Sequence, residues 1–323
     1  MKSQTISLGG EASLTAYLWE DSAELAVLSR PAVLVIPGGG YIMCSDREAE
    51  PIALAYAAEG FQAFVLRYTV RQGFEAPFRE AKAALSLLHE HAEVWHIGKG
   101  QLAVCGFSAG GHLAAALGTL HEGAPDAMIL GYPAVMGKFW KAAGFDIPDL
   151  VERVHKGASP AFLFACEDDA VVPVENVLSF ADALRRCEVP FEAHIFRRGG
   201  HGFSLAKLHT SSGGAEMVNP RAEDWFPLSV SWLKETVGDV AFMKKPTLPE
   251  GLSPAFEERI GVLMQNEQAR AALLSASGVF ADQTVLSIIE QATLSELLLS
   301  LGIPEEQIML LSARLDEIFP EKS

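Results

Sequence analysis

A serine stands between glycines in the segment GFSAG, residues 106–110, where an apolar run gives way to a helical pattern. A sharp turn from a strand into a helix strains the backbone there and lifts the serine hydroxyl above the edge of the sheet. Such a hydroxyl becomes a nucleophile when a base takes its proton. The five residues alone are also compatible with a glycine-rich turn in which Ser108 caps a helix, so its partners decide the interpretation.

An acidic loop, CEDDAVVPVEN, follows the apolar run 161–167. An acid at the carboxyl end of a strand is well placed to orient a histidine that acts as a base. Asp169 fits the pattern D-x-x-V-P of such a loop, and Asp168 and Glu167 are the neighbouring alternatives.

A histidine flanked by glycines, His201, comes after the apolar run 191–196. Glycine allows the loop to bend, so the imidazole can turn back towards Ser108. Serine, acid and histidine then occur in a chain order that is known for histidine-activated serine nucleophiles. This order favours a base over a surface residue as the interpretation of His201.

Three consecutive glycines, residues 38–40, follow the apolar run 31–37. Their N–H groups can turn towards one point and stabilise the oxyanion of a tetrahedral intermediate. Glycine costs backbone entropy on folding, so three in a row after a buried strand indicate a geometric requirement. The expected donors are the backbone N–H groups of Gly39, Gly40 and Ala109, the residue after the serine.

These four features carry a family resemblance. Residues 30–237 resemble the α/β-hydrolase esterases related to acetylxylan esterases and other carbohydrate acetylesterases. The resemblance extends through SDREAEPIALAYAAEGFQAFVLRYTV, AVCGFSAGGHLAA and VVPVENVLSFADALRRCEVPFEAHIF, and it covers about two-thirds of the chain. It implies a nucleophile at Ser108, an acid at Asp169 and a base at His201.

The chain departs from the family pattern at two places. The glycine loop is similar to the HGGG-type loop of esterases, with Pro37 in place of the histidine. The strand before the acid usually ends in His-Gly or a similar pair, whereas this chain has Ala165 and Cys166. The second difference concerns the hydrogen bonding around Asp169.

The fold predicted for residues 1–243 is α/β, a doubly wound, mostly parallel sheet of the α/β-hydrolase type. The apolar runs are too continuous for a half-exposed sheet, so helices should cover both of its faces. The alternating segment 13–20 predicts an outer antiparallel strand. The expected strands are 31–37, 63–70, 101–107, 127–133, 161–167 and 191–196, and the expected helices are 48–59, 75–94, 109–121, 175–187 and 224–236.

A C-terminal all-helical appendage, residues 244–323, is expected after the segment KKPTLPEGLSP, which reads as a linker. Its leucine-rich amphipathic helices need a surface to pack on, which predicts a role in homo-oligomer assembly or in bordering the active site. The signals for helix ends are Ser253 before Pro254, Asp282, Thr293 with Glu296, and Gly302.

The substrate is expected to be a small-molecule ester. Only 27 residues, 134–160, separate two apolar runs between which related enzymes often insert a lid. A short cap cannot build the deep apolar tunnel that a long acyl chain needs. Together with the family resemblance, this predicts acetyl esters of a sugar or similar polyol. Candidate substrate contacts are Tyr41, Phe139 and Trp140, with Phe145 beside them, although aromatic clusters more often belong to the core.

Charge and composition exclude several partners. A formal net charge of −16 argues against binding to nucleic acid or to an anionic membrane surface. No run approaches the ~20 apolar residues of a membrane span, and the first residues lack the apolar region of a signal peptide. The four cysteines are widely spaced, which favours a reduced, cytoplasmic protein.

No cofactor and no metal ion are expected. His89 and His91 would point to different faces of a helix, so they do not make a zinc pair. His112, four residues after Ser108, is interpreted as a structural histidine. Asp46 and Arg47 are expected to pair with each other or to brace the glycine loop.

Two other functions share some of these features. A serine peptidase of the prolyl-oligopeptidase type has the same turn and the same residue order, but it usually carries a large domain that the first 30 residues here cannot supply. A hydrolase fold that serves only as a binding module is the second alternative, and the complete set of serine, acid and histidine argues against it. A serine carboxylic-ester hydrolase is therefore the predicted function.

Overall fold

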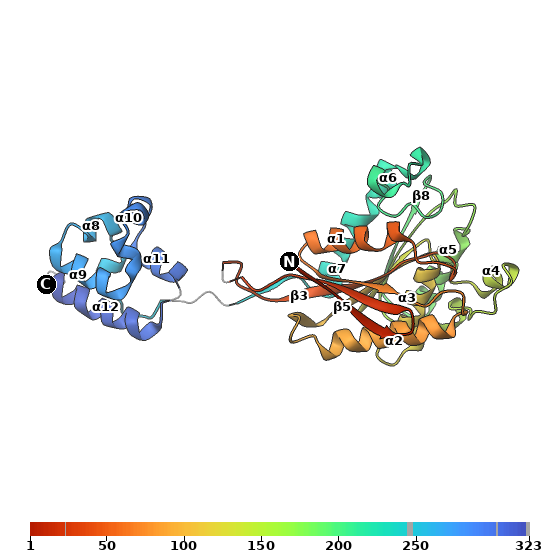
Figure 1. The fold of residues 1–323 in the computed structure, drawn as a ribbon, viewed down its shortest axis with the longest axis horizontal. Helices are drawn as coiled ribbons and strands as arrows, with labels where there is room; N and C mark the ends of the chain where they lie inside the picture. The colour runs from red at the N-terminus through yellow and green to blue at the C-terminus, as the bar shows by residue number, and fades with distance from the viewer. Residues whose placement is uncertain (23, 244–247, 302, 321–323) are drawn as a thin grey trace. The chain divides into compact units, whose positions relative to one another are not determined.

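The computed structural model describes residues 1–22, 24–243, 248–301 and 303–320. The chain forms two compact units, Met1–Phe242 and Met243–Ser323, and each has its own hydrophobic core (Figure 1). Residues 244–247 of the predicted linker lie outside the described part of the chain. Each unit buries its own set of apolar side chains.

A mostly parallel sheet runs through the first unit (Figure 1). Its strand order is β1-β2-β4-β3-β5-β6-β7-β8. The strands from β4 to β8 in this order are parallel, whereas β1 and β2 form an antiparallel edge and β9 pairs antiparallel with β3. This topology confirms the predicted α/β fold class. The strands are β1 (Lys2–Gly9), β2 (Ala12–Leu18), β3 (Val27–Ile36), β4 (Gln62–Arg67), β5 (Ile97–Phe107), β6 (Ala127–Gly131), β7 (Ala161–Cys166), β8 (Phe191–Phe196) and β9 (Ala241–Phe242).

Helices cover both faces of the sheet, as the continuous apolar runs predicted. In Figure 1, α1 and α7 lie on one side of the strands, and α2 and α3 lie on the other. A crossover between neighbouring parallel strands needs such a helix, which then packs back onto the sheet. The helices of this unit are α1 (Glu50–Ala58), α2 (Glu75–Glu90), α3 (Ala109–Leu120), α4 (Gly137–Ala142), α5 (Glu175–Arg186), α6 (Pro220–Glu223) and α7 (Trp225–Thr236).

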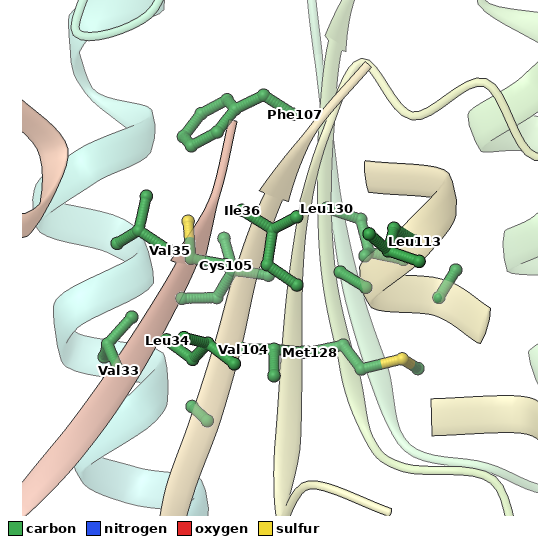
Figure 2. Packing of buried hydrophobic residues seen from close by; sticks show 14 of the residues in the cluster. Val33, Leu34, Val35, Ile36, Val104, Cys105, Phe107, Leu113, Met128 and Leu130 are labelled. Carbon is green, nitrogen blue, oxygen red and sulfur yellow. The ribbon is translucent and has the colours of Figure 1, made fainter. Parts of the chain in front are cut away.

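The central strands are buried on both faces. Successive side chains of a strand point to opposite faces, and Val33, Val35 and Ile36 of β3 are nevertheless all fully buried. Figure 2 shows Val35 and Ile36 pointing to opposite sides of the sheet, with Leu113 of α3 on the side of Ile36. Burying each such side chain stabilises the fold by about 1.5–3 kcal/mol. The rigid centre fixes the strand ends that carry the predicted site.

Strand β5 and helix α3 approach each other closely at two glycines. A Cβ atom at Gly106 would lie 2.2 Å from the carbonyl oxygen of Gly110, and a Cβ at Gly110 would lie 2.2 Å from that of Ile36. Backbone oxygens cannot move aside as a flexible side chain could. Only glycine therefore fits at these two positions of the turn.

Replacing Gly106 by alanine should destabilise the first unit by about 1–3 kcal/mol, because the added methyl group overpacks the turn. Urea unfolding followed by tryptophan fluorescence measures this unit, since all five tryptophans lie within it. Gly157→Ala is the control, because its Cβ would meet only the imidazole of His155, at 3.3 Å. Equal stability of the two variants would contradict the close approach at Gly106.

The described elements of the second unit are helices and 3₁₀ turns, with one isolated β-bridge between Arg259 and Thr293. Its core includes Phe256, Ile260, Leu273, Leu294 and Leu315, all nearly inaccessible to solvent. The predicted helical character of this segment agrees with the structure. The helices are α8 (Ile260–Leu263), α9 (Glu267–Ala276), α10 (Gln283–Ile289), α11 (Leu294–Leu301) and α12 (Glu305–Ile318), with short 3₁₀ turns at Pro254–Glu257 and Gly278–Ala281.

Most of the helix-end signals in this unit have the expected hydrogen bonds. The Thr293 hydroxyl accepts the N–H of Glu296 at 3.2 Å, and the Glu296 carboxylate accepts the N–H of Thr293 at 2.9 Å. The Asp282 side chain caps α10 by accepting the N–H groups of Thr284 and Val285, whereas Ser253 begins a 3₁₀ turn rather than an α-helix. Gly302 lies outside the described residues.

Several short elements were not expected. Strand β1 alternates between exposed and half-buried residues, and its apolar content is too low to stand out. Helices α4 and α6 have six and four residues, too few for a helical period to appear in a sequence. Among the described residues, no helix is long and apolar enough to cross a membrane.

Candidate active site

Ser108 lies at the turn between β5 and α3 with φ 51° and ψ −116°. A positive φ is strained for a residue with a side chain, and here the neighbouring glycines allow it. The Ser108 N–H donates to the carbonyl of Gly131 at 2.9 Å, which ties the turn to β6. The hydroxyl does not cap the helix. It is therefore free to bond elsewhere.

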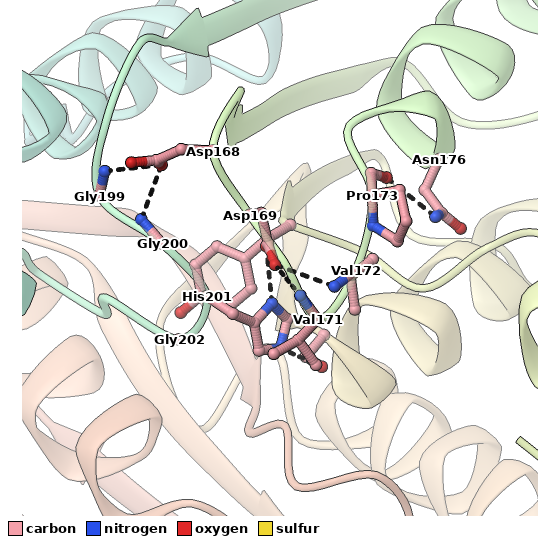
Figure 3. Close-up of polar contacts among 12 residues, drawn as sticks. Asp168, Asp169, Val171, Val172, Pro173, Asn176, Gly199, Gly200, His201 and Gly202 are labelled. Carbon is pink, nitrogen blue, oxygen red and sulfur yellow. Dashed lines mark hydrogen bonds and ion pairs between the residues drawn. The ribbon is translucent and has the colours of Figure 1, made fainter.

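Ser108, His201 and Asp169 form a hydrogen-bonded chain, and Figure 3 shows the imidazole of His201 directed at Asp169. His201 Nδ1 lies 2.7 Å from Asp169 Oδ2, and His201 Nε2 lies 2.9 Å from Ser108 Oγ. A carboxylate only accepts, so Nδ1 carries the proton and Nε2 accepts from the serine hydroxyl. The imidazole is in the tautomer that can take the proton of Ser108.

The Asp169 carboxylate is fixed by its own loop. Its side chain is inaccessible to solvent, and Oδ1 accepts the N–H groups of Val171 and Val172, both at 2.9 Å (Figure 3). These two bonds use Oδ1 and leave Oδ2 directed at His201. The carboxylate is thus oriented before any substrate binds.

The two alternative acids have other environments. Asp168 Oδ1 accepts the N–H groups of Gly199 and Gly200, both at 3.0 Å, and so shapes the loop that carries His201. Glu167 is exposed. The unusual Cys166 lies against Gly199, where a Cβ atom would come within 2.4 Å of its sulfur. Cys166 therefore occupies space behind the histidine loop rather than bonding to Asp169 through its side chain.

The predicted oxyanion loop has the backbone geometry that glycine permits. Gly39 has φ 123° and Gly40 has φ 63°. Within the described part of the chain, no acceptor bonds the N–H groups of Gly39, Gly40 or Ala109. A buried N–H group normally has a partner, so unbonded groups at the mouth of a hollow are available for a ligand oxygen.

A hollow of about 390 Å³ opens above Ser108 and His201. Its only charged side chains are Arg47, Glu48 and, when protonated, His201, among the described residues that line it. The other lining side chains are mostly apolar, and the set is Gly39, Gly40, Ile42, Met43, Ser45, Arg47, Glu48, Ser108, Phe139, Trp140, Ala143, Phe145, Val171, Val172, His201 and Gly202.

The three aromatic candidates have different positions. Phe139 and Trp140 of α4 line the hollow together with Phe145. Tyr41 is not among the residues lining it. Its side chain is buried behind the loop, with the hydroxyl 2.9 Å from His112 Nδ1. Tyr41 therefore supports the loop and does not face a substrate in this structure.

His112 is a buried structural histidine, as expected. Its Nε2 lies 3.0 Å from the Pro148 carbonyl, so Nε2 donates and Nδ1 accepts the Tyr41 hydroxyl proton. Burial lowers the pKa of His112 to about 4, because the charged imidazolium loses its hydration. The side chain connects the glycine loop to the segment before residue 149.

This burial predicts a pH-dependent stability. In the unfolded chain the histidine takes up a proton below its ordinary pKa of about 6.5. In the folded protein it stays neutral until the pH falls to about 4. Stability is therefore complete above pH 6.5 and falls as the pH decreases towards 4. Between pH 7 and pH 5 the first unit should lose about 2 kcal/mol from this group. In urea unfolding, the stability of His112→Gln should not show this loss between pH 7 and pH 5. A pH dependence equal to that of the wild type would contradict the prediction.

Four residues near the site have roles that the sequence did not indicate. Asp46 pairs with Arg67 at 2.8 Å, so it does not pair with Arg47. The guanidinium of Arg47 instead donates to the carbonyl of Gly202, beside His201. Glu48 and Tyr132 were not predicted at all. A glutamate within DREAE looks like a surface residue, and nothing in its spacing signals burial.

Among the described residues, no group of three or more His, Cys, Asp or Glu side chains is arranged to hold a metal ion. The site consists of protein groups: a hydroxyl, an imidazole, a carboxylate and backbone N–H groups.

Known proteins are similar to this chain in fold and in sequence. The sequence model of the family BD-FAE matches residues 23–132. The solved structure of MGS-M1, an α/β-hydrolase enzyme from a Medee basin deep-sea metagenome library, is 39% identical with a TM-score of 0.70, over 73% of this chain and 98% of that one. The chain belongs to the α/β-hydrolase family.

Two curated relatives carry more specific names. Endo-1,4-beta-xylanase B of Butyrivibrio fibrisolvens is 33% identical over an alignment of 239 residues that covers 64% of this chain and 37% of that protein. The acetylxylan esterase of Xylanibacter ruminicola is 26% identical over 223 residues, 62% of this chain and 45% of that protein. The chain thus spans less than half of the length of these two relatives.

Proposed function

We propose that this protein is a serine carboxylic-ester hydrolase that works through an acyl-enzyme. The observation that carries the proposal is the hydrogen-bonded chain from Ser108 Oγ through His201 to the buried Asp169 carboxylate, at 2.9 and 2.7 Å. A serine hydroxyl is a weak nucleophile until a base removes its proton, and this arrangement supplies the base and the group that orients it.

The reaction begins when Ser108 attacks the ester carbonyl and His201 Nε2 takes the hydroxyl proton. The oxyanion that forms accepts hydrogen bonds from the N–H groups of Gly39, Gly40 and Ala109. His201 then protonates the alcohol as it leaves. Water repeats the sequence on the acyl-enzyme, which releases the acid and restores Ser108. Asp169 stabilises the imidazolium in both halves.

The acyl group is small, and acetyl is the best candidate. The hollow of about 390 Å³ is near the lower end of the range of about 300–1,000 Å³ for ligand pockets, and acyl and alcohol parts must share it. Phe139, Trp140 and Phe145 close one side of it. A relative named acetylxylan esterase supports an acetylated carbohydrate as the substrate class.

Short esters should be the preferred substrates. We expect kcat/KM for p-nitrophenyl acetate to exceed that for the decanoate by at least about 100-fold, because the longer acyl chain does not fit into the hollow together with the alcohol part and would overpack its walls. Acetylated xylo-oligosaccharides, followed by acetate release, test the alcohol part. A preference for the decanoate would contradict the small acyl site.

A further inference from the structure

A buried carboxylate without an ionic partner lies beside the hollow. Glu48 is 3% exposed, and no salt bridge between described residues includes it. Burying an unpaired carboxylate costs much more than burying a neutral amide. A glutamine could accept the same N–H group at a lower cost. The position of Glu48 therefore requires an explanation beyond packing.

The first contact of Glu48 is with the oxyanion loop. Its Oε2 accepts the N–H of Gly38 at 2.9 Å, and the Gly38 carbonyl accepts the N–H of Ser45 at 3.0 Å. A Cβ at Gly38 would lie 2.7 Å from this carboxylate oxygen and 3.0 Å from the Cβ of Ser108. The N–H and the carbonyl of Gly38 are thus both held by hydrogen bonds. This sets the direction of the next two N–H groups, which belong to Gly39 and Gly40.

The second contact of Glu48 is with Tyr132, which in turn bonds the loop that carries His201. The Tyr132 hydroxyl donates to Glu48 Oε1 at 2.6 Å, and the Tyr132 hydroxyl oxygen accepts the N–H of Ser204 at 3.1 Å. Burial, reinforced by the charge of Glu48, raises the pKa of Tyr132 well above its usual value, so the phenol remains a donor. Its ring lies edge-on to the His201 ring, with centroids 5.0 Å apart.

The residue before Glu48 fixes the same loop. The Arg47 guanidinium donates to the Gly202 carbonyl, and the Arg47 carbonyl accepts the Ser204 hydroxyl proton. Residues 47 and 48 therefore hold both residues 202 and 204, immediately after the base. Glu48 bonds the oxyanion loop and Tyr132 bonds the loop of the base, so the two side chains together connect the loops.

We propose that Glu48 and Tyr132 are positioning residues that fix the oxyanion loop and the His201 loop relative to each other. The pair acts through Gly38 and Ser204 and touches no reacting atom. This inference rests on the proposed ester hydrolysis. It adds which residues align the base, His201, with the oxyanion donors. Since a misplacement of about 1 Å can cost about 100-fold in rate, such a link affects turnover more than binding.

The test uses Glu48→Gln, Tyr132→Phe and the double variant with p-nitrophenyl acetate. We expect kcat to fall about 10- to 100-fold in each single variant while KM changes less than about twofold. The double variant should be no worse than the poorer single variant by more than about threefold, because the two residues form one link. Glu48→Gln should retain more activity than Glu48→Ala, since its amide oxygen can still accept the Gly38 N–H.

A second readout separates positioning from folding. The Ser108 oxygen adds to the carbonyl carbon of an alkyl trifluoromethyl ketone, and the serine proton passes to His201. The oxyanion that forms accepts hydrogen bonds from the backbone donors. Its Ki does not depend on how much enzyme is folded. We expect Ki to rise in proportion to the loss of kcat in Glu48→Gln and Tyr132→Phe.

Tyr56→Phe is the matched control, because Tyr56 is equally buried and its hydroxyl bonds Ser229 at 2.7 Å without contacting the site. Its kcat and Ki should stay within about twofold of the wild type. Wild-type kcat or an unchanged Ki in Glu48→Gln and Tyr132→Phe would overturn the positioning role, as would multiplied losses in the double variant. A wild-type enzyme without esterase activity would instead refute the proposed function itself.

Discussion

Replacing Ser108 by alanine should lower kcat/KM for p-nitrophenyl acetate by about 10⁴- to 10⁶-fold, the largest effect of any single change. Without the hydroxyl, no acyl-enzyme forms, and His201 can at most activate a water molecule in a site not shaped for it. The backbone donors and the hollow remain, so a small residual rate over the uncatalysed reaction is expected. Steady-state kinetics with enzyme expressed free of host esterases measure this.

The control for this change is Ser231→Ala. Ser231 lies on α7, where its hydroxyl bonds the Pro227 carbonyl on an exposed surface. Its activity should equal that of the wild type. Retention of more than about one-tenth of the activity by Ser108→Ala would remove the serine from the mechanism.

Replacing Asp169 by asparagine should lower kcat by about 10⁴-fold, although the two side chains have the same shape. Val171 and Val172 both donate to Oδ1, so the amide oxygen must occupy that position and the amide nitrogen must face His201. The nitrogen donates to Nδ1, which places the imidazole proton on Nε2. That tautomer cannot accept the proton of Ser108.

Asp168→Asn is the matched control for this variant. Asp168 Oδ1 accepts two backbone N–H groups, from Gly199 and Gly200, and an amide oxygen can accept both. We expect a loss of less than about tenfold in kcat, because the loop keeps its bonds. If Asp168→Asn were as inactive as Asp169→Asn, the acid of the site would have to be reassigned.

The core of the fold could be predicted because its signals are local. Continuous apolar runs such as 101–107 can only be satisfied by a sheet covered on both faces. The exposed edge strand β1 and the four-residue helix α6 lack any such pattern. Their positions depend on pairing with β2 and on the chain around Asn219, which is tertiary information.

The site could be predicted in part for the same reason. Ser108, Asp169 and His201 each follow a strand, and parallel strands bring their carboxyl ends to one edge. Glu48 and Tyr132 are 84 residues apart, and their bond depends on how two loops fold over that edge. Tyr41 was an expected substrate contact, but its hydroxyl bonds His112. The role of the helical unit stays a prediction.

The most direct test of the account is covalent labelling of the nucleophile. The enzyme is treated with a fluorophosphonate, which transfers its phosphonyl group to an activated serine and releases fluoride. Peptide mass spectrometry then locates the adduct. We expect one adduct, on Ser108, that forms at least about 1,000-fold more slowly in His201→Ala, because the base is absent. An adduct on another residue, or an unlabelled Ser108 in an enzyme that hydrolyses acetyl esters, would contradict the central claim.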